Sequence, residues 1–264
     1  MDVIIFGGQS NMQGQSEALT GTEPIEGAYE YRYFGDCAVP LKNPVGEDIT
    51  YGKEWHEPLS EDSDFSEWVN STALGSACYG NTNMVPEFCR KYIEDTGRKV
   101  IAVHCAKGST QAFQWLPDTE RFEVLEEKVL RAVKKAKETD SVEHIYFVWL
   151  QGESDAIFKT SKETYKEQLT VINEALKERL GVEKFGIIRV GRFTNDERDL
   201  VIIEAQDEIC RENSDFLMLT DIATELNKIP EYMNPYVGGH FGVKGLEKLG
   251  YEGGKALAKF TLGK

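Results

Sequence analysis

The chain has 264 residues, of which 41% are hydrophobic and 28% charged, with a formal net charge of −15 and an isoelectric point near 4.8. That length suffices for one large α/β domain or two small ones, and we expect a single domain over residues 1–264. The acidic balance argues against a nucleic-acid partner and against anionic membrane surfaces, because both require clustered Lys and Arg. No apolar stretch reaches the roughly 18 residues that a membrane span needs.

The N-terminus and the cysteines favour a cytoplasmic protein. The first strand begins at once, without the basic region and apolar core of a signal peptide. The cysteines are odd in number, scattered and free of C-x-x-C pairs, which disfavours a zinc site or a disulfide framework. They are Cys37, Cys78, Cys89, Cys105 and Cys210. We expect buried free thiols and no metal site.

Short apolar runs alternate with amphipathic segments along the chain. The first run, Val3–Phe6, leads directly into two glycines, a pattern typical of a buried strand followed by a sharp turn. Further strands are predicted at Val100–Val103, Ile145–Leu150, Phe185–Val190 and Phe216–Leu219. Helices are predicted near residues 85–96, 122–136, 160–180, 196–212 and 243–260. This alternation predicts a parallel sheet of about five strands in a three-layer α/β/α sandwich.

Residues 13–80 interrupt this alternation. They contain few long apolar runs and many turn residues, so we interpret them as a long loop between the first strand and its helix. Long loops in compact domains are usually functional. Trp55, His56 and Trp68 could contact a substrate from this loop, and a surface insertion without a role is the alternative.

Four segments could carry chemistry, and three of them follow predicted strands. They are Gly8-Gln9-Ser10-Asn11-Met12, Ala106-Lys107-Gly108-Ser109-Thr110, Gln151-Gly152-Glu153-Ser154-Asp155 and Gly238-Gly239-His240-Phe241-Gly242. In a parallel sheet the strand ends gather at one edge, where ligands bind. Ser10 is therefore a candidate nucleophile, and His240, flanked by glycines, is a candidate base. The Gly108 backbone N–H and the Gln151 side-chain amide are candidate oxyanion donors.

These four blocks, in this order, resemble the SGNH hydrolases, and most closely the sialate O-acetylesterase and acetylxylan esterase branch. The resemblance spans almost the whole chain. It implies a flavodoxin-like α/β/α sandwich, no metal or other cofactor, and removal of acetyl groups from sugar hydroxyls. It also implies Ser10 as nucleophile, His240 as general base, and an oxyanion hole made by the backbone N–H groups of Ser10 and Gly108 with the side chain of Gln151.

One position departs from the family pattern. The family commonly carries an Asp three residues before the base histidine, where this chain has Val237. A neutral histidine needs a partner that holds its tautomer. We expect Glu153 to supply it, with Asp155 as the second candidate and Asp221 as the third.

The expected partner is a small acetylated sugar, such as an acetylated xylo-oligosaccharide or sialic acid. Gln9, Asn11 and Trp115 are candidate substrate contacts. Turn hydrogen bonding would explain Gln9 and Asn11 equally well, and packing is the more common role for an aromatic such as Trp115. Two other functions stay open. One is a glycoside hydrolase using Glu153 and Asp155 as paired carboxylates. The other is a non-catalytic carbohydrate-binding descendant of the same fold.

Overall fold

A seven-stranded sheet of order β3-β2-β4-β1-β5-β6-β7 organises the protein. The computed structural model describes residues 1–33, 35–46 and 81–264. The strands are β1 (Asp2–Gly8), β2 (Ala28–Arg32), β3 (Cys37–Pro40), β4 (Val100–His104), β5 (Ile145–Leu150), β6 (Lys184–Ile188) and β7 (Phe216–Thr220). All neighbouring strands run parallel except β2 and β3, which are antiparallel. The central position therefore belongs to β1, between β4 and β5.

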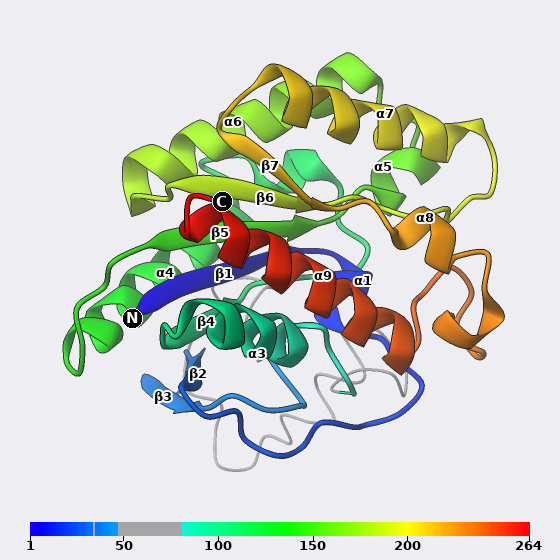
Figure 1. The fold of residues 1–264 in the computed structure, drawn as a ribbon. Coiled ribbons are helices and arrows are strands. Elements are labelled where there is room, and N and C mark those ends of the chain that lie inside the picture. Colours follow the sequence, from blue (N-terminus) through cyan, green and yellow to red (C-terminus); the bar gives the residue numbers. More distant parts are fainter. Residues whose placement is uncertain (34, 47–80) are drawn as a thin grey trace, which may run out of the picture.

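Helices cover both faces of this sheet (Figure 1). The longer ones are α3 (Val85–Thr96), α4 (Glu120–Lys137), α6 (Lys162–Leu180), α7 (Glu197–Glu212) and α9 (Val243–Thr261). Short helical turns are α1 (Ser10–Gln13), η3 (Ala112–Trp115), α5 (Glu153–Ile157), α8 (Ala223–Leu226) and η4 (Pro230–Tyr232). The pair α3 and α9 packs on one face and α4 and α6 on the other, which confirms the predicted α/β/α sandwich. Within the described residues, no helix combines the length and apolar character needed to cross a bilayer.

The predicted loop at residues 13–80 is wrong for part of its length, because β2 and β3 lie inside it and enlarge the expected sheet from about five strands to seven. Only β3 lies at the sheet edge, with β2 between it and β4. β2 mixes tyrosines and charged residues with one alanine, and β3 is four residues long and ends in Pro40. Neither strand carries the long apolar run used to predict the central strands, so the pattern missed both. Cys78, Trp55, His56 and Trp68 lie outside the described residues. Of the other cysteines, all are free thiols; Cys89 and Cys105 are buried, and Cys37 and Cys210 are half-buried.

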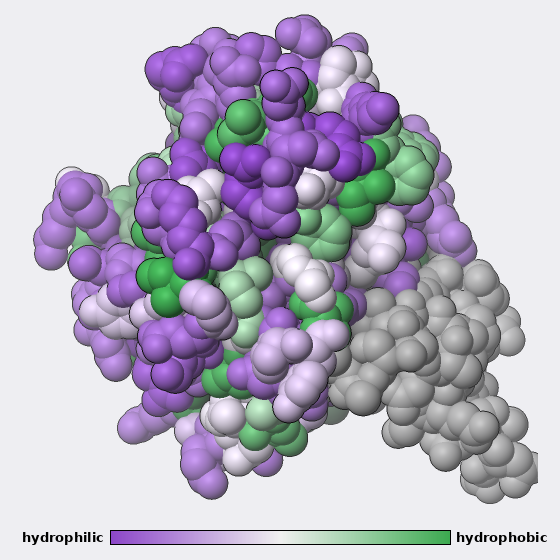
Figure 2. Space-filling view, turned by 90° about the vertical axis from the view of Figure 1, so that its right-hand side faces the viewer, coloured by the Kyte–Doolittle hydropathy of each residue, from purple (hydrophilic) through white to green (hydrophobic). Residues whose placement is uncertain are grey.

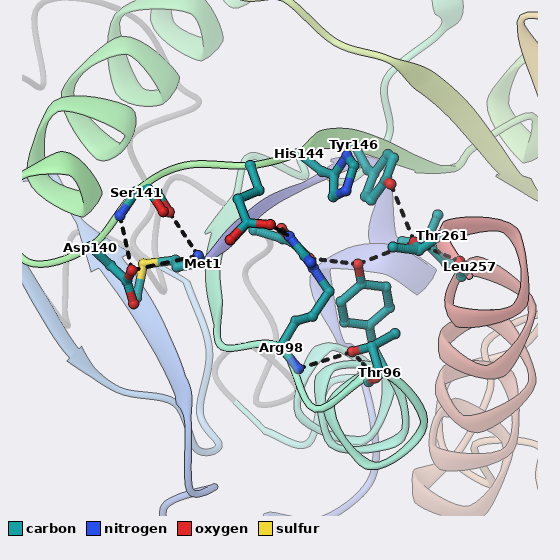
Figure 3. Close-up of polar contacts among 12 residues, drawn as sticks. Met1, Thr96, Arg98, Asp140, Ser141, His144, Tyr146, Leu257 and Thr261 are labelled. Carbon is teal, nitrogen blue, oxygen red and sulfur yellow. Dashed lines mark hydrogen bonds and ion pairs between the residues drawn. The ribbon is translucent and has the colours of Figure 1, made fainter. Parts of the chain in front are cut away.

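A polar network ties the chain together at the amino edge of the sheet (Figure 3). Arg98 donates two hydrogen bonds, of 2.6 and 2.8 Å, to the buried carboxylate of Asp2. The Tyr92 hydroxyl donates to the same carboxylate, and the Thr261 hydroxyl of α9 contacts the hydroxyls of Tyr92 and Tyr146. The N-terminal strand and the C-terminal helix are thereby joined at this edge. The four segments singled out in the sequence lie at the opposite edge, where β1, β4 and β5 end.

The side of the molecule on which these strands end carries a mixed surface (Figure 2). Hydrophilic residues predominate there, and smaller apolar groups are interspersed among them.

Candidate active site

Ser10 is placed by a sharp turn at the end of the central strand. Gly8 has φ +139°, and a Cβ at this position would lie 2.1 Å from the Leu150 carbonyl oxygen, so no larger residue fits. The Gln9 N–H donates to that carbonyl at 3.1 Å, and Ser10 then begins α1. Amides in the first turn of a helix have no intrahelical acceptor. Among the described residues the Ser10 N–H has no hydrogen-bond acceptor, so it can meet an incoming oxygen. The turn predicted from the glycines is confirmed.

His240 lies on a tightly braced loop between η4 and α9. The Asn234 side-chain oxygen accepts the N–H groups of Tyr236 and Val237, and the Asn234 N–H donates to the His240 carbonyl at 2.8 Å. The Asn234 amide also donates to the backbone oxygen of Gln15, just beyond α1, at 2.7 Å. The loop that carries the histidine is therefore held both to itself and to the segment that carries Ser10.

The structure brings Ser10 and His240 into direct contact. Ser10 Oγ lies 2.8 Å from His240 Nε2, and the two residues are 5% and 8% exposed. His240 Nδ1 lies 2.9 Å from the carbonyl oxygen of Gly238. A neutral imidazole with its proton on Nδ1 satisfies both contacts, because Nδ1–H donates to Gly238 and Nε2 accepts from the serine hydroxyl. The backbone carbonyl thus performs the orienting task expected of a carboxylate.

The predicted contact between Glu153 and His240 is not formed. Glu153 Oε1 accepts a hydrogen bond from the Asn11 amide at 2.8 Å, while Oε2 is buried and has no hydrogen-bond partner in the described part of the chain. The second candidate, Asp155, accepts from Gln151, Thr160 and the backbone of Ala112. The third, Asp221, is exposed. Among the described residues, the histidine has its two ring nitrogens satisfied by Ser10 and Gly238.

Glu153 instead supports the histidine loop indirectly, through Asn11. The Asn11 side-chain oxygen accepts the backbone N–H of Phe241 at 3.0 Å, next to the histidine in sequence. Asn11 therefore connects the carboxyl of Glu153 with the loop that carries His240. Burial raises the pKa of Glu153, and the Asn11 hydrogen bond opposes that rise. A carboxyl group in such surroundings holds its proton more tightly than a carboxyl group in water. The contacts of Glu153 are those of a structural support.

Burial also sets the charge of the base. Desolvation lowers the pKa of His240, and the hydrogen bond to the Gly238 carbonyl partly offsets this effect. The Phe193 ring packs edge-on against the imidazole, with 5.6 Å between ring centroids. The imidazole is therefore neutral near pH 7 and ready to accept a proton. His104, by contrast, is fully enclosed and bonded to Met12 and Asn83, and burial lowers its pKa to about 3.

The two predicted oxyanion donors beyond Ser10 differ in their placement. The Gly108 N–H lies beside α1 and donates to the Gln13 side-chain oxygen at 2.8 Å. Gln151 is fully buried, and its amide nitrogen donates to the Asp155 carboxylate at 2.6 Å and to the Thr110 carbonyl at 2.8 Å. An amide nitrogen has two protons, and both are used here. In this arrangement neither amide proton of Gln151 is available to an incoming oxygen, and its contribution to an oxyanion hole stays a prediction.

The predicted substrate contacts are internal braces instead. Gln9 accepts the Ser154 N–H at 3.1 Å, and Asn11 makes the two bonds described above. Trp115 is 1% exposed, packs edge-on against Trp149 and donates to the Thr110 hydroxyl. Side chains this enclosed cannot reach a sugar without rearrangement of the loops around them.

Sequence reasoning missed the roles of Gly238, Asn234 and Gln13. A backbone carbonyl is present at every residue, so no residue type marks the one that orients His240. Asn234 had a recognisable signal, since Asn before a proline favours a turn that its side chain closes. Gln13 follows Ser10 by three residues, the spacing that places two side chains on the same side of a helical turn.

Comparison with known proteins assigns this chain to a family. Residues 1–252 match the family model described as carbohydrate esterase, sialic acid-specific acetylesterase. The chain belongs to this family. It is accordingly a hydrolase that acts on carbohydrate esters, and the resemblance noted in the four sequence blocks is confirmed. Among curated protein sequences, none matches the chain significantly.

Solved structures share the fold of this carbohydrate esterase at low identity. A protein from Arabidopsis thaliana has a TM-score of 0.66 at 15% identity, covering 98% of each chain. NanS has a TM-score of 0.66 at 13% identity, covering all of this chain and 98% of its own. A carbohydrate acetylesterase from Xanthomonas citri has a TM-score of 0.58 at 14% identity, covering all of this chain and 57% of its own. These likenesses extend over the whole architecture.

Proposed function

We propose that this carbohydrate esterase removes O-acetyl groups from small sugars through an acetyl-enzyme intermediate on Ser10. The 2.8 Å contact between Ser10 Oγ and His240 Nε2 carries the proposal. The tautomer held by the Gly238 carbonyl supports it, because that tautomer leaves Nε2 free to accept the hydroxyl proton.

The reaction proceeds in two displacements. Ser10 Oγ attacks the acetyl carbonyl while His240 Nε2 takes the hydroxyl proton, and the Ser10 and Gly108 N–H groups receive the negative charge on the carbonyl oxygen. Collapse of this intermediate expels the sugar oxygen, which takes the proton from His240. A water molecule then gives its proton to His240 and attacks the acetyl-serine. Acetate leaves and the serine recovers its proton.

The absence of a carboxylate behind the histidine, among the residues that the structure describes, has a consequence for the rate. The Gly238 carbonyl fixes the ring and its tautomer, but it carries only a partial charge and stabilises the imidazolium less than a carboxylate would. Preorganisation of the dyad by the Asn11 and Asn234 hydrogen bonds offsets part of this difference. An acetyl ester suits such a base, because the alkoxide of an ester is a better leaving group than the amine of an amide.

The environments of Glu153 and Asp155 disfavour glycoside hydrolysis. Both carboxyls are enclosed, at 3% and 0% exposure, and both are engaged in supporting neighbouring turns. A glycosidase needs its two carboxyls on either side of the scissile bond. A non-catalytic binding protein, for its part, would not need the serine and imidazole aligned at hydrogen-bond distance.

Acetate release tests the proposal. Wild-type protein is incubated with O-acetylated sialic acid, acetylated xylo-oligosaccharides and other acetylated monosaccharides, and acetate is quantified enzymatically. We expect release from at least one substrate and a loss of at least about 10³-fold in kcat for Ser10→Ala. Ser141→Ala, an exposed serine at the amino edge, is the matched control. Equal turnover by Ser10→Ala would refute the serine mechanism.

A further inference from the structure

The Gly108 amide already has an acceptor in the free protein. Gln13 Oε1 lies 2.8 Å from the Gly108 nitrogen, and both residues are buried. Gln13 ends α1, three residues after Ser10, so its side chain extends from the nucleophile's own helical turn to the Gly108 loop. An amide oxygen at this place resembles the carbonyl oxygen of an ester in both its geometry and its partial charge.

The Gly108 loop does not depend on Gln13 for its position. The Lys107 N–H donates to the Gly8 carbonyl at 2.9 Å, which fixes the loop to the end of β1. The Thr110 hydroxyl donates to the Lys107 carbonyl at 2.8 Å, and the Thr110 carbonyl accepts from the Gln151 amide. These three bonds hold the loop on both sides of Gly108. The contact with Gln13 is therefore not needed to shape it.

The Gln13 side chain is itself weakly held. Within the described residues its amide makes the one hydrogen bond to Gly108, and its nitrogen donates to no protein atom. A single neutral hydrogen bond corresponds to roughly a three- to tenfold change in an equilibrium constant. A substrate oxygen that acquires negative charge in the transition state binds an N–H more strongly than a neutral amide oxygen does.

We propose that Gln13 occupies the oxyanion position in the free enzyme and is displaced by the carbonyl oxygen of the substrate. This proposal rests on the proposed function, since it requires the Gly108 N–H to stabilise the oxyanion. Gln13 then acts as a gating residue: it satisfies a buried N–H when no substrate is bound, and the need to displace it from that N–H lowers the apparent affinity for esters. Water is thereby kept from the donor until an ester arrives.

Substitution of Gln13 in opposite directions tests the gate. Gln13→Met keeps the length but accepts hydrogen bonds poorly, so kcat/KM for acetyl esters should rise about three- to tenfold. Gln13→Glu places a carboxylate on the same N–H, a stronger acceptor, so kcat/KM should fall below the wild-type value. Gln168→Met, on α6, is the matched control and should leave kcat/KM unchanged, since the Gln168 side-chain oxygen has no partner to lose among the residues that the structure describes. An unchanged or lower kcat/KM in Gln13→Met would overturn the gate and make Gln13 a support. Gln13→Ala replaces this variant if it does not fold.

Amide hydrogen exchange at Gly108, measured by NMR, gives a readout that needs no turnover. Gln13→Met should accelerate this exchange relative to the wild type and to Gln168→Met, because the Gly108 N–H loses its acceptor. Equal exchange in all three proteins would contradict the contact itself. If the wild type hydrolyses no ester, the proposed function fails, and the exchange rates still decide whether Gln13 covers the Gly108 N–H.

Discussion

Replacing Glu153 with glutamine shows whether this residue is a structural support or the carboxylate of a catalytic triad. The amide oxygen that Glu153→Gln introduces could accept the same hydrogen bond from Asn11 that Glu153 Oε1 accepts at 2.8 Å. The second oxygen, which the amide nitrogen replaces, has no hydrogen-bond partner to lose among residues 1–33, 35–46 and 81–264. Steric change is small because the two side chains have nearly the same shape.

The expected magnitude follows from these contacts. A hydrogen bond to a charged group stabilises a protein by about 1–1.5 kcal/mol more than a neutral one. Even if this whole difference in free energy raised the activation barrier at His240, kcat would fall by no more than about tenfold. If Glu153 were the acid of a triad, the amide would cost about 10⁴-fold in kcat. Acetate release over time, at saturating substrate, separates these outcomes by about three orders of magnitude.

Thermal unfolding supplies the second half of this test. The pKa of Glu153 is raised above its ordinary value of 4.5, so the folded protein holds the carboxyl proton more tightly than the unfolded chain. That contribution to stability is complete below pH 4.5 and is lost as pH rises through the folded pKa. The melting temperature of Glu153→Gln should therefore increase relative to wild type across this interval. Glu167→Gln, at an exposed position on α6, is the matched control. A loss of about 10³-fold or more in kcat, with an unchanged melting temperature, would refute the indirect role of Glu153.

Three further predictions concern the dyad and its supports. Because burial lowers the pKa of His240 below its ordinary 6.5, kcat/KM should rise with pH, reach half its maximum below pH 6.5 and stay level above it; an inflection above 6.5 would contradict the account. Asn11→Ala leaves the Glu153 carboxyl and the Phe241 N–H unpaired, so urea unfolding should show a loss of about 2–6 kcal/mol, at about 1–3 for each group; a loss below about 1 kcal/mol would argue against this brace. Gly239 has φ +74°, and a Cβ there would lie 2.5 Å from Phe193. Gly239→Ala should therefore displace the imidazole and lower kcat about 10- to 100-fold, and crystallography of the variant would show whether His240 has moved.

The central strands and the dyad could be predicted from sequence because their signals are local. A continuous apolar run ending in glycine predicts both a buried strand and the turn that presents Ser10. Parallel topology then brings the ends of β1, β4 and β5 to one edge, which is why four separated blocks could be assigned to a single site. Strands β2 and β3 lacked this signal, because β2 is rich in tyrosine and charged residues and β3 is a four-residue edge strand that ends in proline.

The polar contacts within the site could not be predicted in the same way. Residue type shows that Glu153 and Gln151 can donate or accept, but only packing decides their partners. Asn11 lies between Glu153 and the histidine loop, and Asp155 accepts a hydrogen bond from the Gln151 amide, which an oxyanion would otherwise receive. The acceptor that replaces the expected Asp at position 237 is the main chain of Gly238, for which residue identity carries no information.

Covalent capture of Ser10 tests the central claim most directly. The protein is treated with a fluorophosphonate, and intact-mass spectrometry measures the fraction labelled before peptide mapping locates the adduct. The account predicts one adduct per chain on Ser10, formed at least about 100-fold more slowly in His240→Ala because the hydroxyl loses its base. Absence of labelling, or an adduct on another serine, would contradict the assignment of Ser10 and His240 as the catalytic pair.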